Sequence, residues 1–313
     1  MRALKFLRKK FLPESVLPNS KPSGLVVPLI TPLNENKSVD ELALKTLTAR
    51  LMNKGVKNFF VLNSFSEQEY LSSEQKQKVL EVVSEEVAGR GVIVAGCFGT
   101  DADEIISNIV IASKYATHCV VNVPFLALER ELEFIDFFDS IFTRTTANII
   151  IYNNPVVFKR AIPPLWLDNI INWERLTGVI DFSRNPDYLD ELGKYYQFTK
   201  LFEENEELAF DSLRRGFSGL ACLSSIAFPS YYISLIEEFD EIDFSRMIRQ
   251  EARISSMLKL LPSNKKIQAF KYALSLQRLI QPYYSEGLEH LSEKEKKLVE
   301  QAFGMRQESI RQQ

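Results

Sequence analysis

The sequence predicts a (β/α)8 barrel with a C-terminal helical extension, on three observations. Eight short apolar runs, rich in β-branched residues, recur from Gly24 onward. The runs are nearly continuously hydrophobic, which is typical of parallel strands buried on both faces. A segment compatible with a helix follows each run, and this alternation favours a barrel. A doubly wound open sheet is the alternative, but no G-x-G-x-x-G sequence follows any run.

The expected elements can be placed along the chain. Strands are predicted at residues 24–31, 56–64, 91–97, 118–124, 148–153, 176–181, 197–203 and 219–225. The first helix should end before Gly55, because glycine readily adopts the left-handed conformation that follows a helix. Ser72 with Gln75, and Asp101 with Glu104, have the spacing of a capping box. The apolar stripe of the first helix is expected to contain Leu42, Leu44, Leu47 and Leu51.

Three regions are expected: a basic N-terminal extension (1–22), the barrel (23–236) and a C-terminal helical region (237–313). A basic amphipathic helix at the start of the chain can lie on an anionic membrane or serve in targeting. The alternative is a segment that packs on the body or stays mobile. The basic residues of this extension are Arg2, Lys5, Arg8, Lys9 and Lys10.

Composition and charge limit the classes of partner. The formal net charge of −3 gives no reason to expect nucleic acid. No apolar run approaches the roughly 20 residues that cross a bilayer. Cys97, Cys119 and Cys222 match no zinc or C-x-x-C spacing and are interpreted as small buried side chains. An odd cysteine count without a signal peptide favours a reducing compartment, so we expect a cytoplasmic protein. We also expect no cofactor and no metal.

In a barrel of this kind, chemistry lies at the C-terminal ends of the strands. Neither histidine is placed there, because His118 begins a strand and His290 lies in the helical tail, so a histidine-dependent nucleophile is not expected. Tyr152, near a strand end, is suited to proton relay or to binding a carboxylate, and equally to simple space filling. The acidic run 203–207 is interpreted as a solvated loop rather than as a site for a hard cation.

Several motifs, in order, resemble one known family. They are "GLVVPLITPLNENKSVD", "VLNSFSEQEYLSSEQ", "IIYNNP", "GFSGLACLSS", "LPSNKKIQAFKYAL" and "HLSEKEKKLVEQAF". From about Gly24 to Phe303 the chain resembles the dihydrodipicolinate synthase/N-acetylneuraminate lyase family of pyruvate-dependent class I aldolases and lyases. The resemblance implies a homo-oligomer, a dimer or tetramer, that binds a small keto acid or other carboxylate.

The family resemblance also implies a Schiff base between pyruvate and a lysine on the sixth strand, whose amine attacks the keto carbon. In this chain that lysine position is occupied by Ile180, which cannot form an imine. Tyr152 matches the family's proton-relay tyrosine, and Ser64 keeps the first of two hydroxyls in the G-T-T-G-E motif. Phe65 replaces the second hydroxyl, and Glu67 is retained.

Other positions around the implied site have also changed. Leu126 replaces a family tyrosine after strand four, and Val157 is near the position of an arginine that binds acidic substrates. Lys200 and Lys159 are the alternatives for a relocated amine, although Lys200 is expected below the mouth of the barrel. The catalytic candidates are thus Tyr152, Ser64 and the position of Ile180, and the substrate-binding candidates are Ser64, Phe65, Glu67, Asn153, Asp181 and Glu204.

Three functions remain open. The favoured hypothesis is a degenerate family member, a pseudoenzyme without Schiff-base activity, that acts as a scaffold, a partner subunit or a binder of a small carboxylate. The second is an active lyase or aldolase on a keto acid or sugar acid, with altered catalytic residues. The third is a membrane-associated interaction protein that depends on the basic N-terminus.

Overall fold

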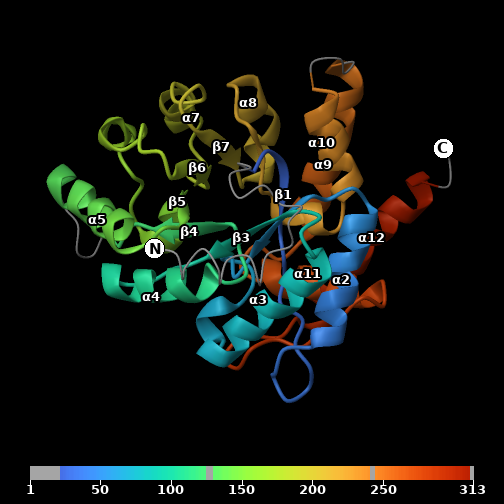
Figure 1. Cartoon of the computed structure of the whole chain (residues 1–313). Coiled ribbons are helices and arrows are strands. Elements are labelled where there is room, and N and C mark those ends of the chain that lie inside the picture. Colours follow the sequence, from blue (N-terminus) through green and yellow to red (C-terminus); the bar gives the residue numbers. More distant parts are fainter. Residues whose placement is uncertain (1–21, 125–129, 240–243, 311–313) are drawn as a thin grey trace.

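The described residues, 22–124, 130–239 and 244–310 of a computed structural model, form a closed barrel of parallel strands surrounded by helices (Figure 1). The strands follow one another around the barrel in sequence order, and the last pairs with the first. This confirms the predicted (β/α)8 class. The strands are β1 (Gly24–Pro28), β2 (Asn58–Val61), β3 (Val92–Gly96), β4 (His118–Asn122), β5 (Asn148–Asn153), β6 (Leu176–Asp181), β7 (Lys200–Glu203) and β8 (Gly219–Leu220).

All eight predicted strands are present, and the fifth and sixth have the predicted bounds. The largest differences are β2, which is shorter than predicted at both ends, and β8, which ends at Leu220 because a short 3-10 helix, η4 (Leu223–Ile226), begins soon afterwards. The barrel closes where Gly24 of β1 pairs with Gly219 of β8. A Cβ atom on Gly219 would lie 1.8 Å from the carbonyl oxygen of Gly24, so this seam requires a glycine.

The helical segments between the strands vary in length. The described chain contains α2 (Glu41–Asn53), α3 (Ser73–Val87), α4 (Ala102–Ala112), α5 (Glu131–Arg144), α6 (Pro155–Phe158), α7 (Pro186–Gly193), α8 (Ala209–Arg214) and α9 (Pro229–Glu237). Three more 3-10 helices are η1 (Gln68–Tyr70), η2 (Pro164–Asn169) and η3 (Glu206–Leu208). Between β5 and β6 the crossover is made by α6 and η2, and no long α-helix covers that step.

The predicted helix signals are largely confirmed. Leu44, Leu47 and Leu51 of α2 are buried, but Leu42 is 76% exposed, so its assignment to the apolar stripe was wrong. Leu42 lies in the first turn of α2, and its side chain points away from the side of the helix that faces the barrel. Gly55 follows the C-cap of α2 with φ 90°, as predicted.

The capping signals differ at the two predicted boxes. Ser72 accepts a hydrogen bond from the Gln75 backbone, and the Gln75 side chain accepts one from the Ser72 backbone, so this box is complete. Asp101 caps α4, but the Glu104 side chain accepts its hydrogen bonds from Thr100 instead.

Replacing Ser72 with alanine tests the value of the complete box. The substitution removes the side-chain acceptor of the Gln75 N–H at the start of α3. We expect a loss of about 1 kcal/mol in the free energy of unfolding, measured by urea denaturation. Ser72→Thr is the control, because threonine retains the acceptor oxygen, and equal losses in both variants would contradict the prediction.

The C-terminal region is helical, as expected, and consists of α10 (Phe244–Leu260), α11 (Lys266–Leu276) and α12 (Glu293–Ile310). Figure 1 shows these helices on the side of the barrel where α2 and α9 lie. Helix α12 packs against both α10 and α11. The domain boundary at residue 237 remains a prediction.

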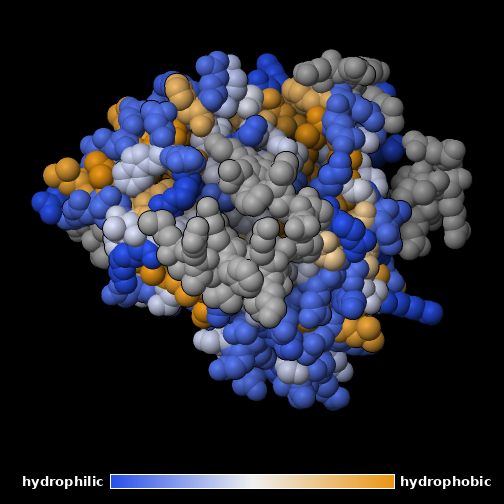
Figure 2. Space-filling view, viewed as in Figure 1, coloured by the Kyte–Doolittle hydropathy of each residue, from blue (hydrophilic) through white to orange (hydrophobic). Residues whose placement is uncertain are grey.

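The surface is mostly hydrophilic. In Figure 2, hydrophobic side chains of the visible face outside the grey atoms form separate patches, as on ordinary protein surfaces. Among the described residues, no helix is both long and apolar enough to span a membrane. The basic segment 1–12, on which the membrane hypothesis depends, lies outside the described residues, and that hypothesis is still a prediction.

The interior of the barrel is a separate apolar cluster. Its side chains come from β1 to β7 and from the residue after β8, and are at most 9% exposed: Val26, Phe60, Val92, Val94, Val120, Ile150, Tyr152, Ile180, Phe202 and Ala221. Cys97, Cys119 and Cys222 are unpaired and buried, which confirms their interpretation as small core residues. His118 begins β4 and is buried at the end of the barrel away from the mouth, as expected.

Candidate functional site

Ile180, which the family resemblance places at the lysine position, lies inside the barrel. Ile180 of β6 is in register with Tyr152 of β5 on one side and with Phe202 of β7 on the other. All three side chains point inward and are at most 1% exposed. The aliphatic side chain of Ile180 therefore lies in one layer with the tyrosine that the sequence singled out.

The Tyr152 hydroxyl is the centre of a hydrogen-bonded cluster, which we call the Tyr152 cluster (Tyr152, Ser64, Asn154 and Glu204). The hydroxyl donates to Glu204 Oε2 at 2.6 Å and accepts from Asn154 Nδ2 at 2.8 Å. Ser64 Oγ lies 2.8 Å away. Since a phenol has one proton and two lone pairs, these contacts satisfy it fully when Ser64 is the donor. The structure thus brings together two predicted catalytic residues and one predicted substrate-binding residue.

Glu204 is the most unusual member of the Tyr152 cluster. Its side chain is fully buried, and its Oε1 atom has no hydrogen-bond partner among the described residues. Burial raises the pKa of this carboxyl to about 8, with the charges of Glu206 and Asp181 adding to the rise. The Tyr152 hydrogen bond and Arg184 act in the opposite direction. The protonated form of Glu204 therefore predominates at pH 7.

Burial also raises the pKa of the Tyr152 phenol well above its usual value, and the nearby Glu204 carboxyl contributes further. Both partners of this hydrogen bond therefore hold their protons at neutral pH. Glu204 and Tyr152 can therefore donate protons at neutral pH, but neither is a strong base.

Aromatic rings cover the Tyr152 cluster. Phe98 stacks on the Tyr152 ring with centroids 5.2 Å apart, and Phe158 meets the same ring edge-on at 6.0 Å. Phe98 and Phe158 also contact each other at 6.0 Å. The space next to the tyrosine is filled by these half-buried rings and by the apolar layer below them.

The predicted site residue Phe65 is elsewhere, because its ring lies 6.3 Å from that of Phe182 and packs with the core outside the barrel. Leu126 lies outside the described residues. Val157 is 50% exposed. The two phenylalanines that cover Tyr152 were missed by the sequence reasoning. The sequence feature that could have identified them is an aromatic residue shortly after β3 and shortly after β5.

Asn153 and Asp181 lie on the other face of the sheet, one residue beyond Tyr152 and Ile180. Asn153 Nδ2 donates to Asp181 Oδ1 at 2.5 Å, and Asn153 Oδ1 accepts from the Ile162 backbone at 2.9 Å. Asp181 Oδ2 accepts from both the backbone and the hydroxyl of Ser183. Burial raises the pKa of Asp181 to about 6. These two predicted substrate-binding residues hold the loops after β5 and β6 and do not join the Tyr152 cluster.

The interpretation of residues 203–207 as a solvated loop was wrong for its first three members, which are buried. Glu203 pairs with Asp181 as the last residue of β7, and the Glu204 N–H donates to the Asp181 carbonyl at 2.9 Å. This pairing carries both side chains into the protein, where each is 0% exposed. Glu203 points away from the barrel interior and accepts from Asn205 N and Ser212 Oγ, both at 2.8 Å.

Glu67, predicted to bind substrate, is in a buried ion pair with Lys271 of α11. Its Oε2 also accepts from the Ser285 backbone at 2.6 Å, while Lys271 Nζ donates to the Tyr283 carbonyl at 2.9 Å. Glu67 has φ 58°, which turns the chain at the end of the loop after β2. Its side chain therefore faces the C-terminal helices.

Neither proposed replacement amine reaches the Tyr152 cluster. Lys200 lies two residues before Phe202, which is level with Ile180, so its backbone is roughly 7 Å lower in the barrel. The Phe202 ring is on the same face of β7 as Lys200 and lies between Lys200 and the Tyr152 cluster. Lys159 is exposed, and its Nζ donates to the Val156 carbonyl at 3.3 Å.

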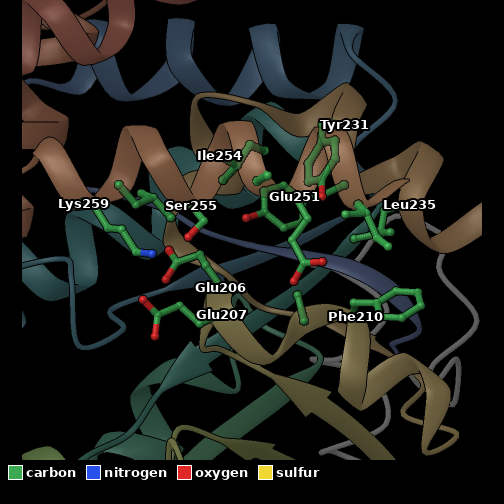
Figure 3. Close-up of a pocket in the computed structure, with 14 residues that line it drawn as sticks. Glu206, Glu207, Phe210, Tyr231, Leu235, Glu251, Ile254, Ser255 and Lys259 are labelled. Carbon is green, nitrogen blue, oxygen red and sulfur yellow. The ribbon is translucent and has the colours of Figure 1, made fainter. Parts of the chain in front are cut away.

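A separate cavity of about 420 Å³ lies between η3, α8, α9 and α10. Figure 3 shows Glu206 and Glu207 facing Glu251 and Lys259 across it, with apolar side chains such as Phe210 at one end. None of the described residues that line it belongs to the predicted site. No group of three or more His, Cys, Asp or Glu side chains in the described ranges could hold a metal ion.

Comparison with known proteins gives one family. The profile of the Dihydrodipicolinate synthetase family matches residues 21–304. The 4-hydroxy-tetrahydrodipicolinate synthase of Chlorobium limicola is 25% identical over 293 residues, covering 89% of this chain and 95% of the relative. The enzyme of the same name from Methanothermobacter thermautotrophicus is 23% identical over 251 residues, covering 77% and 87%.

Solved structures agree on the fold. The 4-hydroxy-tetrahydrodipicolinate synthase of Methylacidiphilum fumariolicum superposes with a TM-score of 0.86 at 18% identity, covering 93% of this chain and 98% of that one. The N-acetylneuraminate lyase of Fusobacterium nucleatum gives 0.83 at 17% identity, covering 91% and 99%. With a barrel of this topology and a profile match along nearly its whole length, the chain belongs to the Dihydrodipicolinate synthetase family.

Proposed function

We propose that this chain is a member of the family that has lost Schiff-base chemistry and acts as a non-catalytic barrel, either as a scaffold or as a partner subunit of an active relative. The observation that supports the proposal most directly is Ile180, an alkyl side chain in the interior layer beside Tyr152. An imine requires a primary amine, so the loss is qualitative.

The surroundings of Ile180 support the same proposal. Among the described residues Lys271 is the only buried lysine, and it is paired with Glu67. Phe98 and Phe158 occupy the space beside the Tyr152 ring where a keto acid would need to lie. The homo-oligomer implied by the family resemblance stays a prediction.

Borohydride trapping tests this function. The native protein is incubated with pyruvate and sodium borohydride, and its intact mass is then measured. We expect no pyruvate-dependent adduct, because borohydride traps pyruvate only where an amine has formed an imine. The 4-hydroxy-tetrahydrodipicolinate synthase of Chlorobium limicola, treated in parallel, is the positive control. A stoichiometric adduct that maps to Lys200 or Lys159 would overturn the proposal.

The alternative function is an active lyase or aldolase with altered residues, and one observation favours it. Glu204 keeps a proton at neutral pH and shares a hydrogen bond with Tyr152, as a general acid would. Cleavage or condensation of keto acids or sugar acids that Glu204→Gln abolishes would establish this alternative.

A further inference from the structure

One polar group of the Tyr152 cluster contacts the Glu204 carboxyl, and two others orient that group. The Tyr152 hydroxyl binds Glu204 Oε2 directly, and Ser64 and Asn154 hold that hydroxyl in place. Ser64 comes from the loop after β2, Tyr152 and Asn154 from the end of β5, and Glu204 from the end of β7. The hydroxyl and amide groups and the carboxyl thus come from different parts of the barrel and meet at its mouth.

Glu204 does not have the contacts of a structural acid. Its neighbour Glu203 uses both carboxyl oxygens in hydrogen bonds, and so does Asp181. Glu204 uses one, and the other is buried without a hydrogen-bond partner among the described residues. Buried polar atoms are normally paired, so an orphaned oxygen at the mouth of a barrel calls for an explanation.

We propose that the Glu204 side chain occupies a receptor for a small carboxylic acid, so that the barrel fills its own binding site from within. In this view the Tyr152 hydroxyl, held by Ser64 and Asn154, is the receptor, and Phe98 and Phe158 form its apolar cover. The ligand class is a monocarboxylic acid of one or two carbons, such as acetate, which matches the side-chain atoms that Glu204 places there. This inference rests on the proposed loss of imine chemistry and adds the residue that keeps the site closed.

The proposal predicts that shortening this side chain opens the receptor. Glu204→Ala removes the carboxyl and leaves Tyr152, Ser64 and Asn154 in place. Sodium acetate is then added to this variant and to the wild type, with sodium chloride of equal ionic strength as the salt control. We expect acetate to raise the Tm of Glu204→Ala by roughly 5 °C at a hundredfold excess over Kd. The wild type should respond to acetate no more than to chloride.

Two further variants serve as controls. Glu204→Gln keeps the side-chain volume and an acceptor for the Tyr152 proton, so it should not gain a response to acetate. Glu203→Gln changes the adjacent buried acid on the opposite face of the sheet and should also show none. An acetate response of Glu204→Ala that is no larger than the chloride response would overturn the inference, and so would an equal response of the wild type.

If Glu204→Ala does not fold in buffer, Glu204→Ser is measured in the same way. If neither folds, both are refolded in acetate and in chloride, and the recovery of folded protein is compared. Recovery that requires acetate supports the inference, and equal recovery overturns it. A borohydride-trapped adduct on the wild type would instead defeat the proposed function, so the two failures can be told apart.

Discussion

The wild type should lose stability relative to Glu204→Gln as the pH rises. The carboxyl has an ordinary pKa of 4.5 and, when buried in the fold, a pKa of about 8. Between these values the folded wild type keeps the proton and the unfolded chain releases it, so stability falls as the pH rises through this window. Since each pH unit corresponds to about 1.4 kcal/mol, the loss is at most about 5 kcal/mol.

The glutamine variant does not have this ionisation. It keeps an acceptor for the Tyr152 hydroxyl, so the difference in unfolding free energy between the two proteins isolates Glu204 from Asp181 and Glu203, which titrate in both. We expect the wild type to lose stability relative to Glu204→Gln steadily from pH 5 to pH 8, as measured by urea denaturation at each pH. Parallel curves for the two proteins would show that Glu204 does not retain its proton in the fold.

Lys271→Ala should destabilise the fold by about 3–5 kcal/mol, because it leaves the Glu67 carboxylate buried without its partner. Both side chains of the pair are 0% exposed, so water cannot replace the lost ammonium group. The variant also leaves the Tyr283 carbonyl without its donor. Chemical denaturation measures the loss, and Glu67→Ala should give a loss of similar size.

A double variant separates the pair from its members. Glu67→Leu combined with Lys271→Met removes both charges, and we expect it to be clearly more stable than Lys271→Ala. Lys194→Ala is the surface control, because Lys194 and its partner Glu191 are both exposed, and it should cost at most about 1 kcal/mol. If Lys271→Ala lowers the free energy of unfolding no more than the surface control does, the buried Glu67–Lys271 pair does not stabilise the contact between the barrel and α11.

The sequence predicted the barrel well because its signals are local. Continuous β-branched runs, glycine after α2 and the Ser72 box depend on neighbouring residues, and the structure reproduces them. The bounds of β8 were less predictable, because the chain turns into η4 where the apolar run continues. Whether Leu42 is buried depended on which side of α2 faces the barrel. The apolar pattern in the first turn of a helix defines that side poorly.

The candidate site was predicted only in part, for a different reason. The resemblance identified Tyr152, Ser64 and Ile180 individually, and the structure places Tyr152 in contact with Ser64 and in register with Ile180. The contact between Tyr152 and Glu204 joins two strands that are not adjacent, and the Glu67–Lys271 pair joins a loop to a distant helix. Such contacts depend on the tertiary structure. They leave no periodic pattern in the sequence from which they could be predicted.

The layer shared by Tyr152, Ile180 and Phe202 restricts how this protein can evolve. A lysine at position 180 would place an ammonium group against aromatic rings, at a large desolvation cost. Even a neutral amine there would have no room for a keto acid while Phe98 and Phe158 cover the tyrosine. Schiff-base chemistry at this position would therefore require several replacements together, and Ile180→Lys alone would not supply it.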